Sequence, residues 1–141
     1  MKKISKAKIK EIAKKYDINA VYLFGSQVTG AVHKNSDYDF AVQFSETVAG
    51  NKYFDLKLKI MGEMMKLAKS DKVDLVILNE EKSPLSLKNR IIKDGKILFV
   101  NDDIKRSRME TRIMSLYRDR QYYFKRHIKE SLENIAKNGI L

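Results

Sequence analysis

The sequence predicts a mixed α/β sheet domain with a helical C-terminal arm. Helical and strand patterns alternate from residue 4 to residue 100, an order that favours a sheet of about four strands flanked by helices. Residues 102–138 then contain neither proline nor glycine. Hydrophobic residues make up 43% of the 141 residues, which is enough for one folded core. We therefore assign residues 1–100 to a sheet domain and residues 101–141 to an arm of the same unit, which we expect to bind a partner.

The first half of the chain predicts one helix and two strands. Residues 4–16 place isoleucine and alanine at helical spacing among lysines, which indicates an amphipathic helix. Residues 21–24 are apolar and end at Gly25, as a buried strand that enters a turn does. Residues 29–35 form a connector with weak helical character. Residues 36–44 alternate between apolar and polar side chains, and this period of two predicts a strand.

The second half predicts two further strands and three or four further helices. Residues 53–69 carry apolar side chains among lysines and predict a long amphipathic helix. Residues 73–78 are β-branched and apolar around one aspartate, which predicts a strand. A helix over 83–93 begins with a capping serine and a proline in its first turn. Residues 96–100 predict a fourth strand, and 102–138 predict one long helix or two in succession.

Composition excludes several classes of protein. The absence of cysteine excludes disulfides, thiolate zinc sites and cysteine nucleophiles. No apolar run reaches the roughly 18–20 residues that span a bilayer, and lysines interrupt the basic start, so we expect no export segment and a cytoplasmic protein. The net charge of +11 favours polyanionic partners but is equally consistent with a lysine-rich solvated surface.

Three aspartates form the most informative pattern. Asp37 and Asp39 lie two apart on a predicted strand, so both carboxylates emerge on one face and repel each other. A divalent cation removes that repulsion, and Mg²⁺ prefers one or two carboxylates together with water and phosphate oxygens. Asp74 lies within an apolar strand, where we expect it to be buried. If the two strands are neighbours, Asp74 completes a two-metal site for phosphoryl-type transfer.

A glycine turn lies next to these acids in the predicted order. Gly25 follows a strand, so backbone N–H groups can approach a phosphate there without a Cβ in the way, and Ser26 adds a hydroxyl donor. Gly30 permits close packing at the start of a following helix, whose N-terminus favours anions. Each of these patterns is weak alone. Their order between residues 25 and 74 favours a metal-dependent nucleotide site.

These residues resemble a known family. Gly25-Ser26, ten residues, then Asp37-Tyr38-Asp39 is similar to the Gly-Ser-x₁₀-Asp-x-Asp signature of polymerase-β-fold nucleotidyltransferases. The wider pattern resembles the minimal nucleotidyltransferase (MNT) subgroup from about residue 8 to residue 100. The arm, with residues 114–117, resembles more loosely the tail of MNT-type antitoxins.

The resemblance implies a function for the whole chain. It implies a polymerase-β-like core that transfers AMP from ATP, with Mg²⁺, to a tyrosine of a HEPN ribonuclease toxin and so neutralises the toxin. The metal-binding and catalytic residues that it implies are Asp37, Asp39 and Asp74. The nucleotide-binding residues that it implies are Gly25, Ser26, Gly30 and Ser36.

Two other functions and several acceptors remain open from the sequence. A binding-only antitoxin would occlude the toxin with its arm, and a small-molecule nucleotidyltransferase of the aminoglycoside-modifying kind would need a further substrate domain. The acceptor is a protein tyrosine, an RNA end or a small molecule. The aromatic and arginine residues of 112–126 favour a protein interface over packing on the core or contact with RNA.

Overall fold

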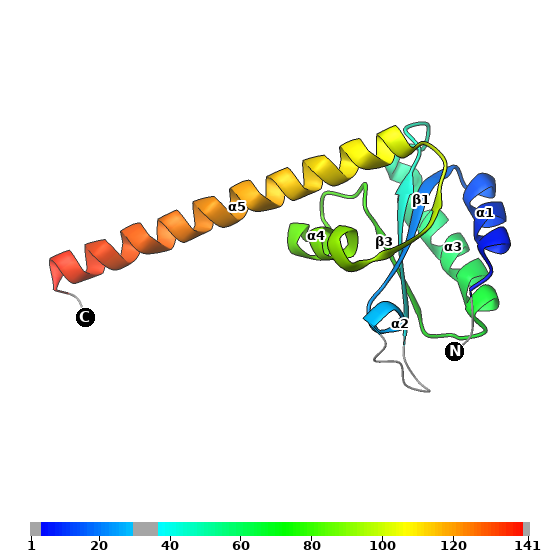
Figure 1. Ribbon diagram of the computed structural model, residues 1–141, viewed down its shortest axis with the longest axis horizontal. Helices are drawn as coiled ribbons and strands as arrows, with labels where there is room; N and C mark the ends of the chain where they lie inside the picture. Colours follow the sequence, from blue (N-terminus) through cyan, green and yellow to red (C-terminus); the bar gives the residue numbers. More distant parts are fainter. Residues whose placement is uncertain (1–3, 30–36, 140–141) are drawn as a thin grey trace.

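The computed structural model describes residues 4–29 and 37–139. The helices and strands follow the predicted order: α1 (Lys6–Lys15), β1 (Ile18–Phe24), α2 (Ser26–Thr29), β2 (Tyr38–Phe44), the 3₁₀ turn η1 (Gly50–Lys52), α3 (Tyr53–Ala68), β3 (Val73–Ile77), α4 (Leu85–Asp94), β4 (Lys96–Val100) and α5 (Asp103–Asn138). The predicted fold class, a mixed sheet with flanking helices and a helical arm, is confirmed (Figure 1). No helix in these ranges is long and apolar enough to cross a membrane.

The sheet has the strand order β3-β2-β1-β4. Strand β1 pairs antiparallel with both β2 and β4, whereas β2 and β3 are parallel. Parallel neighbours need a crossover connection, and α3 supplies it. This topology brings the end of β1 and the beginnings of β2 and β3 to the same end of the sheet.

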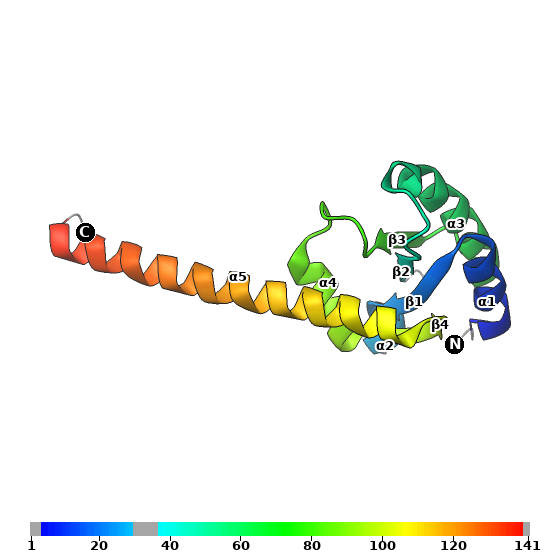
Figure 2. The same cartoon turned by 90° about the horizontal axis from the view of Figure 1, so that it is seen from above.

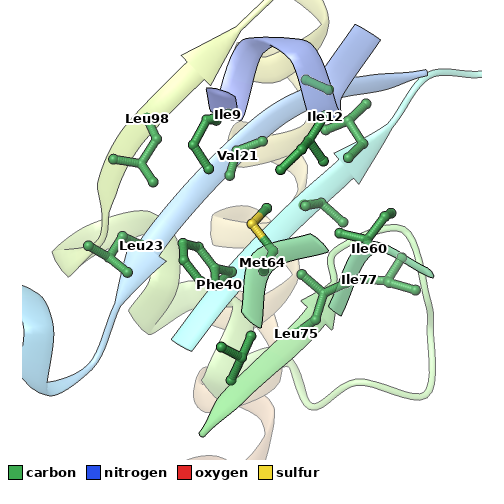
Figure 3. Close-up of a cluster of buried hydrophobic side chains, with 14 of the residues drawn as sticks. Ile9, Ile12, Val21, Leu23, Phe40, Ile60, Met64, Leu75, Ile77 and Leu98 are labelled. Carbon is green, nitrogen blue, oxygen red and sulfur yellow. The ribbon is translucent and has the colours of Figure 1, made fainter. Parts of the chain in front are cut away.

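One face of the sheet packs against α1 and α3 (Figure 3). In both helices the buried residues recur at helical spacing, so one stripe of each helix meets the strands. The buried side chains of this layer include Ile9, Ile12, Val21, Leu23, Phe40, Ile60, Met64, Leu75, Ile77 and Leu98. Each such side chain contributes about 1.5–3 kcal/mol by its removal from water, so this layer provides most of the hydrophobic core.

The opposite face is covered by α4 and the first turns of α5 (Figure 2). Its smaller cluster joins Ala20, Tyr22 and Ala41 of the strands to Ile91 of α4. Met109 of α5 packs against the edge of this cluster. Successive residues of a strand alternate between faces. Because Phe40 and Leu75 face the first layer, their neighbours in the strands belong to this second face. These neighbours are Asp39, Ala41, Asp74 and Val76.

Helix α5 is one continuous helix of 36 residues. The Asp102 side chain caps its start by accepting a hydrogen bond from the Lys105 N–H, and Gly139 ends it in the left-handed conformation. Ile113 is its one buried residue, and beyond it the helix projects away from the domain (Figures 1 and 2). Tyr122, Tyr123 and Phe124 are 60–76% exposed. Packing of this aromatic cluster on the core, one of the open alternatives, is therefore wrong.

Three boundaries differ from the sequence prediction. Strand β1 begins at Ile18 and not at residue 21. The sequence pattern missed this extension because the polar Asn19 is buried through hydrogen bonds and not through apolar contact. Strand β2 begins at Tyr38, so Asp37 precedes the strand. The N-cap of α4 is Pro84 and no side chain caps it, so the serine that precedes this proline is not the cap.

Candidate functional site

Asp39 and Asp74 lie directly opposite each other on the parallel strands β2 and β3. Each is the second residue of its strand. Asp39 precedes Ala41 by two residues and Asp74 precedes Val76 by two, and both Ala41 and Val76 belong to the second face. Both carboxylates therefore emerge on the face that α4 covers and at the end of the sheet where β2 and β3 begin. The expectation that these strands are neighbours is confirmed.

The turn after β1 lies against the same carboxylates. Phe24 pairs with Asp39 across the two strands, and Gly25 follows with a φ of +77°, a backbone conformation that side-chain-bearing residues rarely adopt. A Cβ at Gly25 would collide with Asp39 Oδ2, so glycine permits both the turn and the close approach of the carboxylate. The Val28 N–H donates to the Gly25 carbonyl at 3.1 Å, and α2 begins already at Ser26, before Gly30.

This end of the sheet carries three carboxylates that repel one another. Burial raises the pKa of the Asp39 carboxyl, and the charges of Asp74 and Asp37 raise it further. Within the described ranges none of the three carboxylates forms an ion pair. Three oxygen donors with a shared repulsion fit a hard divalent cation such as Mg²⁺.

The structure corrects two expectations about these acids. Asp74 is exposed, not buried, because β3 is an edge strand and its second face is open at this point. One of its oxygens, Oδ1, accepts a hydrogen bond from the Leu75 N–H at 2.9 Å. Asp37 is also exposed, since it lies just before the strand. Among residues 4–29 and 37–139, no three acidic or histidine side chains are already gathered around one point as metal ligands.

Two predicted site residues cannot be placed. Gly30 and Ser36, which the sequence predicts to contact the nucleotide, lie outside the described residues. Their roles stay predictions.

The other end of the sheet holds a different polar arrangement. The buried Asn19 donates to Gln43 Oε1 at 2.8 Å and to the Asp102 carbonyl at 3.1 Å, and accepts from the Asp102 N–H at 2.8 Å. These bonds attach the start of α5 to β1. Because every partner is satisfied, we interpret this network as a structural anchor.

A cavity of about 800 Å³ opens beside this anchor, and none of the three aspartates lines it. Sequence reasoning missed one notable residue in its wall, the buried Lys88 of α4. A signal was present, since Lys88 precedes the buried Ile91 by three residues and therefore belongs to the inward face of an amphipathic helix.

Comparison with known families agrees with the geometry. The family described as "Polymerase beta, Nucleotidyltransferase" matches residues 7–104, a segment that includes the Gly25 turn and all three aspartates. The chain is also 30% identical over 124 residues to the protein adenylyltransferase MntA of Aphanizomenon flos-aquae (strain 2012/KM1/D3). That alignment covers 84% of this chain and 78% of the relative.

Solved structures share the fold. A chain of a toxin–antitoxin crystal structure with AMP-PNP superposes with a TM-score of 0.67 at 25% identity, covering 91% of this chain and 98% of that one. A chain of the complex between a tri-AMPylated HEPN toxin and an MNT antitoxin of Shewanella oneidensis gives a TM-score of 0.61 at 22% identity, covering 90% and 95%. At this lower identity the second likeness concerns the fold alone.

Proposed function

This chain belongs to the polymerase-β nucleotidyltransferase family, and we propose that it is an antitoxin that transfers AMP from Mg²⁺-bound ATP to a tyrosine of a partner HEPN toxin in the cytoplasm. Modification of the toxin neutralises it. The observation that carries this proposal is the pairing of Asp39 with Asp74 in register beside the Gly25 turn. The relative of Aphanizomenon flos-aquae, a protein adenylyltransferase, supports AMP as the transferred group.

Asp37, Asp39 and Asp74 are the residues that would hold the metal. Bound there, Mg²⁺ neutralises charge on the phosphates and lowers the pKa of an attacking hydroxyl. The raised pKa of Asp39 supports this assignment, because a cation relieves the repulsion that disfavours the charged carboxylate. The other carboxylate oxygen of Asp74, Oδ2, does not bond the Leu75 N–H and remains available for a ligand.

The Gly25 turn would hold the ATP phosphates. Its left-handed backbone conformation turns the chain directly into Ser26 where Gly25 closely approaches Asp39, so the N–H groups of the turn and the serine hydroxyl would reach phosphates bound beside the carboxylates. Gly30 and Ser36 would complete the phosphate contacts. Transfer of AMP requires mainly that the α-phosphate be positioned and its charge neutralised, which this end of the sheet is built to do.

The acceptor would be a side chain of another protein. Attack of a tyrosine oxygen on the α-phosphorus forms the new P–O bond and breaks the bond to the leaving pyrophosphate, and the phenolic proton passes to a carboxylate or to water. Asp74 is suited to accept it, since it is exposed on an edge strand that another protein can approach. The likeness to a chain of a toxin–antitoxin structure with AMP-PNP supports a toxin as the acceptor.

The experiment uses the product of the gene that neighbours the gene of this chain, which we propose to be the toxin. Incubation with ATP and Mg²⁺, followed by intact-mass and fragment mass spectrometry, is expected to find AMP on a toxin tyrosine. Asp37→Asn combined with Asp39→Asn should abolish the addition. Asp94→Asn should retain it, because Asp94 is an exposed aspartate on α4 with no recorded ion pair or hydrogen bond in the described chain. Transfer that persists in EDTA would contradict the metal assignment.

A second candidate, a binding-only antitoxin, is favoured by the projecting half of α5. Phe124, Ile128 and Leu132 are 43–60% exposed and follow one another at four-residue spacing along one side of this helix, an apolar stripe that a partner protein would cover. Phe124→Ser should weaken toxin binding by about tenfold or more. The matched Phe54→Ser, an exposed phenylalanine of α3, should leave binding unchanged. Full neutralisation by the Asp37→Asn/Asp39→Asn chain would favour this candidate over AMP transfer.

A further inference from the structure

The cavity beside the Asn19 anchor is a separate feature from the aspartate end. It lies between the last residues of β2 and β3, helix α4 and the first half of α5. The aspartates lie at the opposite end of the same two strands. Asp39 and Asp74 are near the starts of β2 and β3, whereas the cavity residues Phe44 and Leu78 are at their ends. The volume of about 800 Å³ falls within the range of cavities that bind small molecules.

Lys88 is the most unusual residue of the cavity wall. Its side chain is only 6% exposed, and in the described part of the chain it forms neither a hydrogen bond nor an ion pair. Burial lowers the pKa of its amine, and the charges of Glu81 and Glu80 oppose this only in part. A buried ammonium is costly unless it is paired or solvated, so an anion that reached the Lys88 amine would be favoured there.

The Lys88 amine has access to the cavity space. Among the described residues, only one side-chain polar atom is buried from solvent and also lacks a hydrogen-bond partner. That atom is Glu63 Oε2, on α3. The Lys88 Nζ is therefore not sealed, and the space that it can reach is the cavity that its side chain lines. A ligand that enters the cavity can meet this charge directly.

Two arginines of α5 line the same cavity. Arg108 and Arg112 are four residues apart and therefore lie on one side of the helix, where like charges repel. Within the described ranges neither forms an ion pair. Lys105 also lines the cavity, but it forms an ion pair with Glu46, with 3.6 Å between Nζ and Oε2. Lys88, Arg108 and Arg112 are thus three unpaired cations around one space.

The rest of the wall is mixed. Four carboxylates line it, and of these Glu46 pairs with Lys105 and Asp102 caps α5, whereas Asp17 and Glu81 form no ion pair among the described residues. The apolar part of the wall is formed by Leu78, Phe99, Met109 and Ile113, which come from three elements or their ends. This apolar part favours a flat or hydrophobic body, whereas the three cations favour a phosphate or carboxylate.

We propose that this cavity binds a phosphate monoester with a flat apolar body, of the size of a nucleoside monophosphate. The phosphate is held by Lys88, Arg108 and Arg112, and the apolar body lies against Phe99 and Met109. The proposal is independent of AMP transfer at the aspartates, because the two sites share no residue.

Titration with AMP in EDTA, which removes the metal required at the aspartates, tests this site on the full chain. We expect the backbone amides of residues 78, 99 and 109 to shift in heteronuclear NMR spectra, and those of residues 25, 39 and 74 to remain in place. Lys88→Met should weaken AMP binding by about tenfold or more, the loss of one charge-assisted contact. Arg112→Gln should weaken it several-fold.

Matched variants and probes distinguish the parts of the proposal. Lys93→Met on α4 and Arg118→Gln on α5 replace exposed residues that do not line the cavity and should leave the affinity unchanged. Adenosine and inorganic phosphate should each bind at least about tenfold more weakly than AMP. Adenosine that binds as tightly as AMP would overturn the anion site, and phosphate that does so would overturn the apolar half.

Two further results would overturn the proposal as a whole. One is the absence of shifts at the cavity amides at about 10 mM AMP, a concentration that detects even very weak binding. The other is an equal affinity in the Lys88→Met and Arg112→Gln chains. Lys88→Met replaces a buried unpaired charge with an apolar side chain of similar length, so we expect it to fold at least as stably as the wild type. Arg112 is exposed, and its variant tests the site without altering the core.

Discussion

The two ends of the sheet differ in their charged groups: one gathers three aspartates, and the other mixes cations and carboxylates around a cavity. At the start of β2 and β3, Asp37, Asp39 and Asp74 form no ion pair in the described chain, and the pKa of Asp39 is raised by burial and by its neighbours. At the other end, Lys88, Arg108 and Arg112 line one cavity and form no ion pair among the described residues, although four carboxylates line the same cavity. The first arrangement fits a cation and the second an anion.

A third polar group shows what a purely structural arrangement looks like. Asn19 is as buried as Lys88, yet its side chain donates to Gln43 and Asp102 and also accepts from Asp102. Buried polar groups are normally satisfied in this way within the protein. Unsatisfied charge, and not burial or cavity size alone, therefore separates the two proposed binding ends from the anchor.

The largest effect is expected at the Gly25 turn. Gly25→Ala introduces a Cβ that collides with Asp39 Oδ2 and imposes a side chain on a positive φ. Displacement of the carboxylate should slow AMP transfer to the toxin by about 100-fold, measured by the rate of mass gain. Gly62→Ala is the matched control, since a Cβ at Gly62 meets nothing within 4 Å. Equal rates in the two variants would break the link between the turn and the site.

The anchor should respond in stability and not in chemistry. Asn19→Leu removes its side-chain hydrogen bonds and leaves the buried Gln43 Oε1 without its donor. The free energy of unfolding in urea should therefore fall by about 2 kcal/mol. Asn51→Leu, at an exposed position of η1, should change it by no more than about 0.5 kcal/mol. AMP transfer by the folded Asn19→Leu chain should stay within about threefold of the wild type, because the anchor lies away from the aspartates. A loss as large as that of Gly25→Ala would contradict the separation of the two ends.

The smallest effect concerns Tyr22, between the two ends on the second face. Its hydroxyl donates to Glu110 at 2.7 Å, so Tyr22→Phe should cost about 1 kcal/mol of unfolding free energy at pH 8. Burial, and then the Glu110 contact, raises the pKa of Tyr22 above its ordinary value of 10.0. The folded state therefore holds the phenolic proton more tightly than the unfolded state does.

The sign of the pH dependence follows from that shift. The contribution of Tyr22 is fully present below pH 10.0 and declines as the pH rises above it, because the unfolded chain ionises first. The difference in unfolding free energy between wild type and Tyr22→Phe should therefore shrink between pH 9 and pH 11, as measured by urea unfolding. A difference that grows over this range would contradict the buried, neutral phenol.

Much of the acid end was predictable from the sequence. The spacing of Asp37 and Asp39 and the glycine after a short apolar strand are local patterns, and local periodicity fixes which face of a strand a side chain occupies. The exposure of Asp74 was not predictable, because an apolar run looks the same in an edge strand and in a central one. The pairing of β2 with β3 decides it, and that pairing is a contact between distant segments.

The basic end was not predictable for a related reason. Lys88, Arg108 and Phe99 come from three elements, and only the fold brings them around one cavity. The net charge of +11 indicated an affinity for anions but gave no location. The single helix α5 was one of two open alternatives, since a segment free of proline and glycine does not show whether it contains a break.

Paramagnetic NMR with Mn²⁺ in place of Mg²⁺, in the presence of AMP-PNP, tests the central claim most directly. If the aspartate end is the metal–nucleotide site, the amide signals of Gly25, Asp39 and Asp74 broaden beyond detection, and those of Lys88 and Phe99 at the far end stay sharp. Asp37→Asn with Asp39→Asn should abolish the broadening. Signals at the aspartate end that stay sharp while others broaden would contradict the account.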